Sequence, residues 1–171
     1  MVTPNHLSVL GIIHTAISIL AILAGLFALL RDGKIDPANS RGKLYTWLTV
    51  FTCLTALPIM RFGHLMPGHY LAIIILILLP LGIYSGRIFG KSADYLQMII
   101  MSTTLFLSFV PAINETLTRL PIDHPLASGP NDPLVQKGFL ILTVIFIAGV
   151  IYQVIKLKHR KKVVQAPTPA F

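Results

Sequence analysis

Residues 71–84, LAIIILILLPLGIY, decide the fold. The strands of a membrane barrel alternate polar and apolar residues over about ten positions, and this segment does not alternate. Backbone N–H and C=O groups that lie in lipid need hydrogen-bond partners within their own segment, and an unpaired strand leaves them without partners. The segment therefore predicts a helix that crosses a membrane.

Four further apolar segments accompany this one. Together the five segments cover residues 7–30, 44–60, 70–89, 95–113 and 138–155. About 20 helical residues span the hydrocarbon core of a bilayer, so four segments fit comfortably and 44–60 is the shortest. The sequence predicts an all-α integral membrane bundle of five transmembrane helices in one domain, residues 1–156. A basic, Pro-containing cytoplasmic tail, residues 157–171, is expected to be disordered.

The composition excludes other classes of protein. The chain is 54% hydrophobic and 12% charged, with a mean hydropathy of +0.77. Soluble domains carry about 25% charged residues, so neither a soluble globule nor a disordered chain fits. The net charge of +8 would indicate a nucleic-acid partner in a soluble protein, but in a membrane protein basic residues set orientation. We therefore expect no nucleic-acid partner.

The distribution of Lys and Arg predicts the orientation. The loop after the first segment, the loop after the third and the C-terminal tail together hold 11 of the 14 basic residues, and the other side holds three. Basic residues concentrate on the cytoplasmic side of membrane proteins. The N-terminus is therefore predicted outside and the C-terminus in the cytoplasm of a multi-pass inner-membrane protein. Its expected partners are the lipid bilayer and other membrane subunits.

Small residues at a spacing of four predict where helices approach each other. The third segment carries Gly82, Gly86 and Gly90, and the first carries Ala21 and Gly25. Small residues at i and i+4 allow close backbone contact between helices in lipid. We expect the first and third helices to touch in the cytoplasmic half.

Polar residues inside the apolar segments indicate a candidate pocket. Thr104, Ser108 and Glu115 share one helix face, with Asn114 beside them, and His14 lies about two turns into the first segment. Polar groups at membrane depth usually face the interior of the bundle. These five residues are predicted to line an outward-facing polar pocket. His14 could instead hydrogen-bond a Thr or Ser of a neighbouring helix.

The outer histidines allow a second interpretation. His14 with His64 or His69 could ligate a b-type haem. The stretch that holds Met60, His64, Met66 and His69 offers thioether and imidazole ligands, which suit Cu(I).

Two stretches resemble a family of small bacterial multi-pass membrane proteins of unknown function. They are residues 24–56, AGLFALLRDGKIDPANSRGKLYTWLTVFTCLTA, and 109–121, FVPAINETLTRLP, which is followed by PNDPLVQ and a last apolar segment. Some relatives carry a histidine in the first of these elements, where this chain has Asn39, Ser40 and Arg41. The resemblance implies the membrane fold and adds no catalytic residue.

No motif of a soluble enzyme is present: the sequence contains no P-loop, no HExxH and no GxSxG. The sequence favours a binding or accessory component with an outward-facing polar pocket. A haem- or copper-binding redox or metal-handling protein is the first alternative, and a small transporter is the second.

Overall fold

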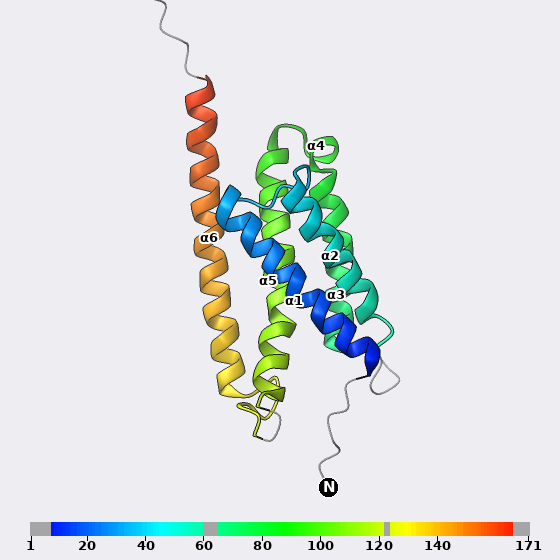
Figure 1. Ribbon diagram of the computed structural model, residues 1–171. Coiled ribbons are helices and arrows are strands. Elements are labelled where there is room, and N and C mark those ends of the chain that lie inside the picture. Colours follow the sequence, from blue (N-terminus) through cyan, green and yellow to red (C-terminus); the bar gives the residue numbers. More distant parts are fainter. Residues whose placement is uncertain (1–7, 60–64, 122–123, 166–171) are drawn as a thin grey trace, which may run out of the picture.

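The computed structural model describes residues 8–59, 65–121 and 124–165, and within these ranges the chain is helical without any strand. Five long helices of the described ranges run alternately up and down, so that the start of α1 and the end of α6 lie at opposite ends of the bundle (Figure 1). The elements are α1 (Val9–Asp32), α2 (Ser40–Ala56), α3 (Pro67–Ile83), α4 (Ser85–Ile88), the 3₁₀ turn η1 (Gly90–Ser92), α5 (Ala93–Arg119) and α6 (Pro133–Gln165).

Local capping contacts set the first two helices. The Ser8 hydroxyl accepts from the N–H of Gly11 at the start of α1, and Asn39 Oδ1 accepts from the N–H of Gly42 at the start of α2. These bonds satisfy N–H groups that a helix start leaves without partners. Gly33 ends α1 at φ +73°, a left-handed conformation that glycine adopts without strain.

The loop between α1 and α2 is held by ionic contacts. Arg41 Nη1 lies 2.8 and 3.0 Å from the two carboxylate oxygens of Asp32, and Asn39 Nδ2 donates to the same carboxylate. Burial alone would raise the pKa of Asp36, but hydrogen bonds from Lys34 and the backbone of Ala38 hold it below its ordinary value. The loop is thus a fixed structure that sets the angle between the two helices.

The helices pack as two hairpins and one added helix. α1 packs along α2, α3 packs along α5, α2 joins the hairpins by contacting α3, and α6 packs on α5. The buried core runs between α2, α3 and α5 and under the first loop. Its members are Ala28, Ile35, Tyr45, Cys53, Ala72, Ile75, Leu79, Met101 and Leu105.

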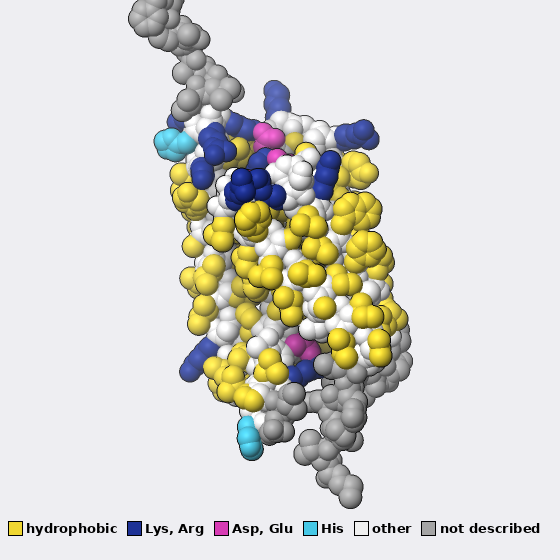
Figure 2. Space-filling view, in the orientation of Figure 1, with side chains coloured by type: hydrophobic (Ala, Val, Ile, Leu, Met, Phe, Trp, Pro, Cys, Tyr) yellow, Lys and Arg dark blue, Asp and Glu magenta, His cyan; other side chains and the backbone are white. Residues whose placement is uncertain are grey.

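Large apolar side chains are exposed on the long helices of the bundle. Figure 2 shows apolar side chains over the central band of the visible face, with Lys and Arg gathered toward the end where α4 lies. Within the described ranges, three helices are long and apolar enough to cross a membrane: α1, α5 together with η1, and α6. A soluble protein exposes few contiguous apolar patches of this size, so the surface is that of a membrane protein.

The helix boundaries differ from the predicted segments in several places. The helix predicted over 44–60 is α2, which begins earlier, at Ser40, and ends earlier, at Ala56. The helix predicted over 70–89 is divided into two helices, α3 and α4. α5 continues beyond 113 to Arg119. Charged residues end the apolar segment, but they do not end the helix. Arg119 pairs with Glu115 one turn before it, and such a pair stabilises the last turns of α5.

The prediction of a disordered tail from residue 157 is wrong for residues 157–165. α6 continues through them to Gln165. Lys, Arg, Gln and Leu are good helix formers, and no Gly or Pro interrupts the helix before Pro167. Cations also interact favourably with the C-terminal end of the helix dipole.

The predicted contact between the first and third helices is also wrong. Among the described residues α1 does not contact α3. A Cβ on Gly25 would meet Tyr45 and Leu105, and a Cβ on Gly82 would meet Met101 and Ile100. Short loops place helices that follow each other in the sequence side by side. The small residue Gly25 of α1 therefore packs against α2 and α5, and Gly82 of α3 packs against α5.

The remaining small residues have separate places. Ala21 is buried in α1, whereas a Cβ on Gly86 or Gly90 would meet nothing within 4 Å. Gly90 has φ +50° in η1, so its role is to turn the chain rather than to pack helices.

One buried polar side chain attaches α6 to the rest of the bundle. Gln153 is 5% exposed; its Oε1 accepts from the Ser102 hydroxyl of α5 at 3.0 Å, and its Nε2 donates to the Gly33 carbonyl at 3.0 Å. Lys161 Nζ adds an ion pair with Asp94 at 2.7 Å. These polar contacts all lie in the half of α6 that ends at Gln165.

Replacing Gln153 by leucine is expected to lower the free energy of unfolding by about 1 kcal/mol, since a hydrogen bond between membrane helices contributes about 0.6 kcal/mol on average. Thermal unfolding of the purified protein in detergent measures the change. Gln136→Leu is the matched control, because Gln136 is exposed and bonds only the nearby Pro130 carbonyl among the described residues. Equal stability of the two variants would contradict a role for Gln153 in holding α6.

Candidate functional site

The predicted pocket residues lie in the half of the bundle away from the basic loops. α1 and α3 begin at this end, and α2 and α5 finish there. We call it the histidine end, because His14 of α1 and His69 of α3 lie within it. The opposite end, formed by residues 31–43, 84–94 and 156–162, is the basic end.

His14 is held by α2. Its Nδ1 lies 3.1 Å from the Thr52 carbonyl and 3.1 Å from the Thr55 hydroxyl, and its Nε2 lies 3.5 Å from the Ser18 hydroxyl. The expectation that His14 bonds a Thr of a neighbouring helix is confirmed. A carbonyl next to Nδ1 places the proton on that nitrogen and leaves Nε2 as an acceptor.

Thr104 forms a buried hydroxyl pair with Tyr45, and Ser108, which is half-buried, bonds the backbone of its own helix. The Tyr45 hydroxyl lies 2.8 Å from Thr104 Oγ1, and Ser108 donates to the Thr104 carbonyl at 2.9 Å. Tyr45 and Thr104 are both 0% exposed. The prediction that Thr104 lines an outward-facing pocket is therefore wrong: its hydroxyl joins α5 to α2 in the core.

Asn114 and Glu115 lie farther along α5, toward the histidine end. Asn114 Oδ1 is buried and has no hydrogen-bond partner among the described residues, while Glu115 is exposed and pairs with Arg119. Within the described part of the chain, no hydrogen bond or ion pair joins either residue to His14.

His69 is the most deeply buried histidine among the described residues. It is 4% exposed, and its Nδ1 accepts from the Met66 N–H at 2.9 Å. Nδ1 also lies 3.3 Å from the Met66 carbonyl, and the shorter contact with the N–H favours the tautomer with its proton on Nε2. Nε2 is buried, and no described residue hydrogen-bonds it. In this tautomer Nε2 is a hydrogen-bond donor and has no lone pair for a metal.

The haem and copper alternatives stay predictions. Within the described ranges no group of three or more His, Cys, Asp and Glu side chains converges as a metal site would. Met60 and His64 lie outside the described residues. Met66 precedes α3 and is half-buried. His14, with Nδ1 against a carbonyl and Nε2 acceptor, has the arrangement of a ligating histidine, whereas His69 does not.

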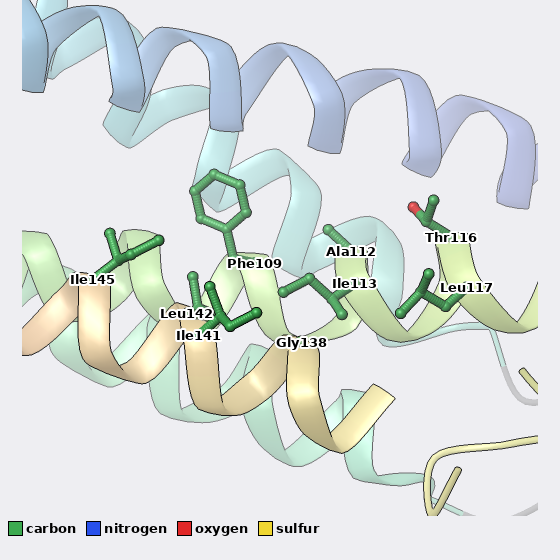
Figure 3. Close-up of a pocket in the computed structure, with 9 residues that line it drawn as sticks. All are labelled: Phe109, Ala112, Ile113, Thr116, Leu117, Gly138, Ile141, Leu142 and Ile145. Carbon is green, nitrogen blue, oxygen red and sulfur yellow. The ribbon is translucent and has the colours of Figure 1, made fainter. Parts of the chain in front are cut away.

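An apolar hollow of about 530 Å³ lies between α5 and α6 at the histidine end. Figure 3 shows its walls, with Phe109 and Ile113 from α5 facing Ile141, Leu142 and Ile145 from α6. Thr116 supplies the only hydroxyl of its lining. Apart from this hydroxyl, the side chains that line the hollow are apolar.

No family model, curated protein or solved structure matches the chain. The family resemblance of residues 24–56 and 109–121 therefore stays a prediction, and the site is interpreted from its own geometry.

Three polar residues that the sequence patterns do not single out make important contacts in the structure. Tyr45 and Gln153 are buried hydrogen-bonding groups between helices, and Thr52 presents both its carbonyl to His14 and a buried, unpartnered hydroxyl. Gln153 could have been found as the single polar residue within IAGVIYQVI. Tyr45 and Thr52 carry no such signal, because their segment is rich in polar residues throughout.

Proposed function

We propose that the chain is an integral protein of a bacterial inner membrane that crosses the bilayer five times, with its N-terminus outside and its C-terminus in the cytoplasm. α2 and α3, with 17 residues each, are about 26 Å long and join the three longer helices as spans. An odd number of spans is consistent with termini at opposite ends of the bundle. The concentration of Lys and Arg at the basic end supports its placement in the cytoplasm.

We further propose that the protein is a binding or accessory component, whose ligand or membrane partner engages the histidine end. One observation carries this proposal: Thr52 Oγ1, His69 Nε2 and Asn114 Oδ1 are buried, and no described residue hydrogen-bonds them. All three lie on the halves of α2, α3 and α5 that form the histidine end.

Unpartnered buried groups favour an external partner for a physical reason. Leaving one such group unbonded costs about 1–3 kcal/mol, and natural proteins retain few of them. A polar group that hydrogen-bonds there recovers this energy. The set contains a donor on His69, an acceptor on Asn114 and a hydroxyl that serves as either, so it fits a small polar ligand or a polar group of another subunit.

Cysteine accessibility tests both the orientation and the outward opening. Cys53, the only cysteine, is first replaced by alanine, and single cysteines are then placed at positions 14, 114 and 115. A membrane-impermeant thiol reagent added to intact cells is expected to modify these positions. Ile13→Cys, one residue from His14 and exposed toward the expected lipid, is expected to stay unmodified.

The basic end supplies the control for orientation. Lys34→Cys is expected to react only after the cells are made permeable. Uniform inaccessibility at 14, 114 and 115 would exclude an outward-facing polar site. Labelling of Lys34→Cys in intact cells would reverse the proposed orientation.

A further inference from the structure

The end of α6 carries a small hollow that the site at the histidine end does not involve. Its volume is about 270 Å³, and Ile155, Lys158, His159 and Lys162 line it. Their spacing of three, four and seven residues places all four on one face of the helix. Ile155, Lys158, His159 and Lys162 are all exposed.

The basic residues of this segment divide into two sets. Lys156 lies over the Tyr152 ring and near Gly33. Lys161 pairs with Asp94 and lies over the Tyr95 ring. Both lysines therefore make contacts within the protein. Lys158 and Lys162, within the described part of the chain, have no acidic partner. The hollow is therefore lined by two lysines whose charge no described acidic side chain neutralises.

The same helix face changes from apolar to basic along its length. Ile151 and Ile155 are 54% and 53% exposed and precede Lys158 and Lys162 on this face. The change occurs where α6 leaves the apolar band and enters the basic end (Figure 2). An acyl chain lying along Ile151 and Ile155 would bring its headgroup to the two lysines.

We propose that this face of α6 binds an anionic phospholipid of the inner leaflet. The phosphate lies between Lys158 and Lys162, which supply ammonium donors, and His159 adds an imidazole N–H to a phosphate oxygen. The hydrocarbon covers Ile155 and Ile151. This inference rests on the bilayer placement proposed above, and it adds a ligand class that neither the histidine end nor the α5–α6 hollow provides.

Quenching by brominated lipid measures the preference directly. The full chain carries Trp47→Phe, which removes the only tryptophan, and Ile151→Trp, which places one on the apolar part of this face. The protein is reconstituted in phosphatidylcholine vesicles that contain dibrominated phosphatidylglycerol or the same fraction of dibrominated phosphatidylcholine. We expect stronger quenching by the brominated phosphatidylglycerol.

The lysines are then varied with a matched control. Lys158→Gln with Lys162→Gln is expected to reduce the preference for phosphatidylglycerol about five-fold per lysine removed. Lys43→Gln with Lys91→Gln removes the same charge from exposed positions of the basic end and is expected to leave the preference intact. Lys158→Arg with Lys162→Arg is expected to retain it.

The outcomes separate this inference from the proposed function. If both pairs of lysine-to-glutamine substitutions lower the preference for phosphatidylglycerol equally, the preference comes from diffuse surface charge and not from a site. If the protein with Trp47→Phe and Ile151→Trp alone shows no preference for phosphatidylglycerol, the inference is also overturned. In either case quenching by brominated phosphatidylcholine persists if α6 lies in the bilayer. No quenching by either lipid would overturn the membrane placement itself.

Discussion

Replacing Gly42 by alanine is expected to destabilise the protein by about 3 kcal/mol or more, the largest effect of any single methyl group in this fold. A Cβ at this position would lie 1.9 Å from the Asp36 carbonyl oxygen and 2.3 Å from its carbonyl carbon. Both are backbone atoms, so no side chain can rotate away to make space.

The consequence of this clash extends beyond residue 42. The Gly42 N–H donates to Asn39 Oδ1 at 2.8 Å, and Asn39 in turn bonds the carboxylate that Arg41 holds. Opening the loop to admit a methyl group breaks this set of contacts and shifts α2 against α1. The buried Ile35 side chain would leave the core with the loop.

Unfolding in detergent with increasing denaturant measures the Gly42→Ala effect. Gly149→Ala is the matched control, because a Cβ on Gly149 of α6 would meet nothing within 4 Å and alanine is the better helix former. We expect the control to unfold at the same point as the parent protein or later. A Gly42→Ala variant as stable as the control would contradict the close approach of the loop.

Gly25→Ala is expected to cost about 1–3 kcal/mol through overpacking in the core. Its Cβ would lie 2.8 Å from Leu105 Cδ1 and 2.8 Å from Tyr45 Cδ2. Tyr45 cannot move freely, because it is fully buried and its hydroxyl bonds Thr104. The methyl group therefore separates α1 from α2 and α5 or breaks the Tyr45–Thr104 hydrogen bond.

A double-mutant cycle distinguishes this mechanism from a general loss of stability. Leu105→Ala removes one of the two clashing groups, so the cost of Gly25→Ala is expected to be smaller in its presence than in the parent protein. Gly68→Ala, where a Cβ would meet nothing within 4 Å, serves as a control in α3. Strict additivity of Gly25→Ala and Leu105→Ala would argue that the two residues do not touch.

The existence of the helices could be predicted from the sequence because lipid permits few alternatives. An apolar run such as 71–84 has only the helix available to satisfy its backbone. The ends were less predictable, since α5 continues through Asn114 and Glu115 into a region where polar side chains help the helix. A run of apolar residues indicates which part of a helix is suited to contact lipid. It does not indicate the residue at which the helix itself ends.

The partners of each residue could not be predicted in the same way. The spacing of Ala21 and Gly25 identifies a face on which another helix lies close, but it does not name that helix, and the neighbour is α2 and α5 rather than α3. Thr104 and Ser108 share a face with Glu115, yet Thr104 is directed to Tyr45 in the core. Which polar groups meet depends on how all five helices assemble.

Gln153 also has a consequence for the order in which the protein is made. The chain is synthesised from its N-terminus, so α6 leaves the ribosome after α1 and α5. By then the Ser102 hydroxyl and the Gly33 carbonyl, to which Gln153 bonds, have already been synthesised. The Gln153 amide therefore emerges when both groups that it bonds are already present, so its polar atoms can be satisfied as soon as α6 packs on α5.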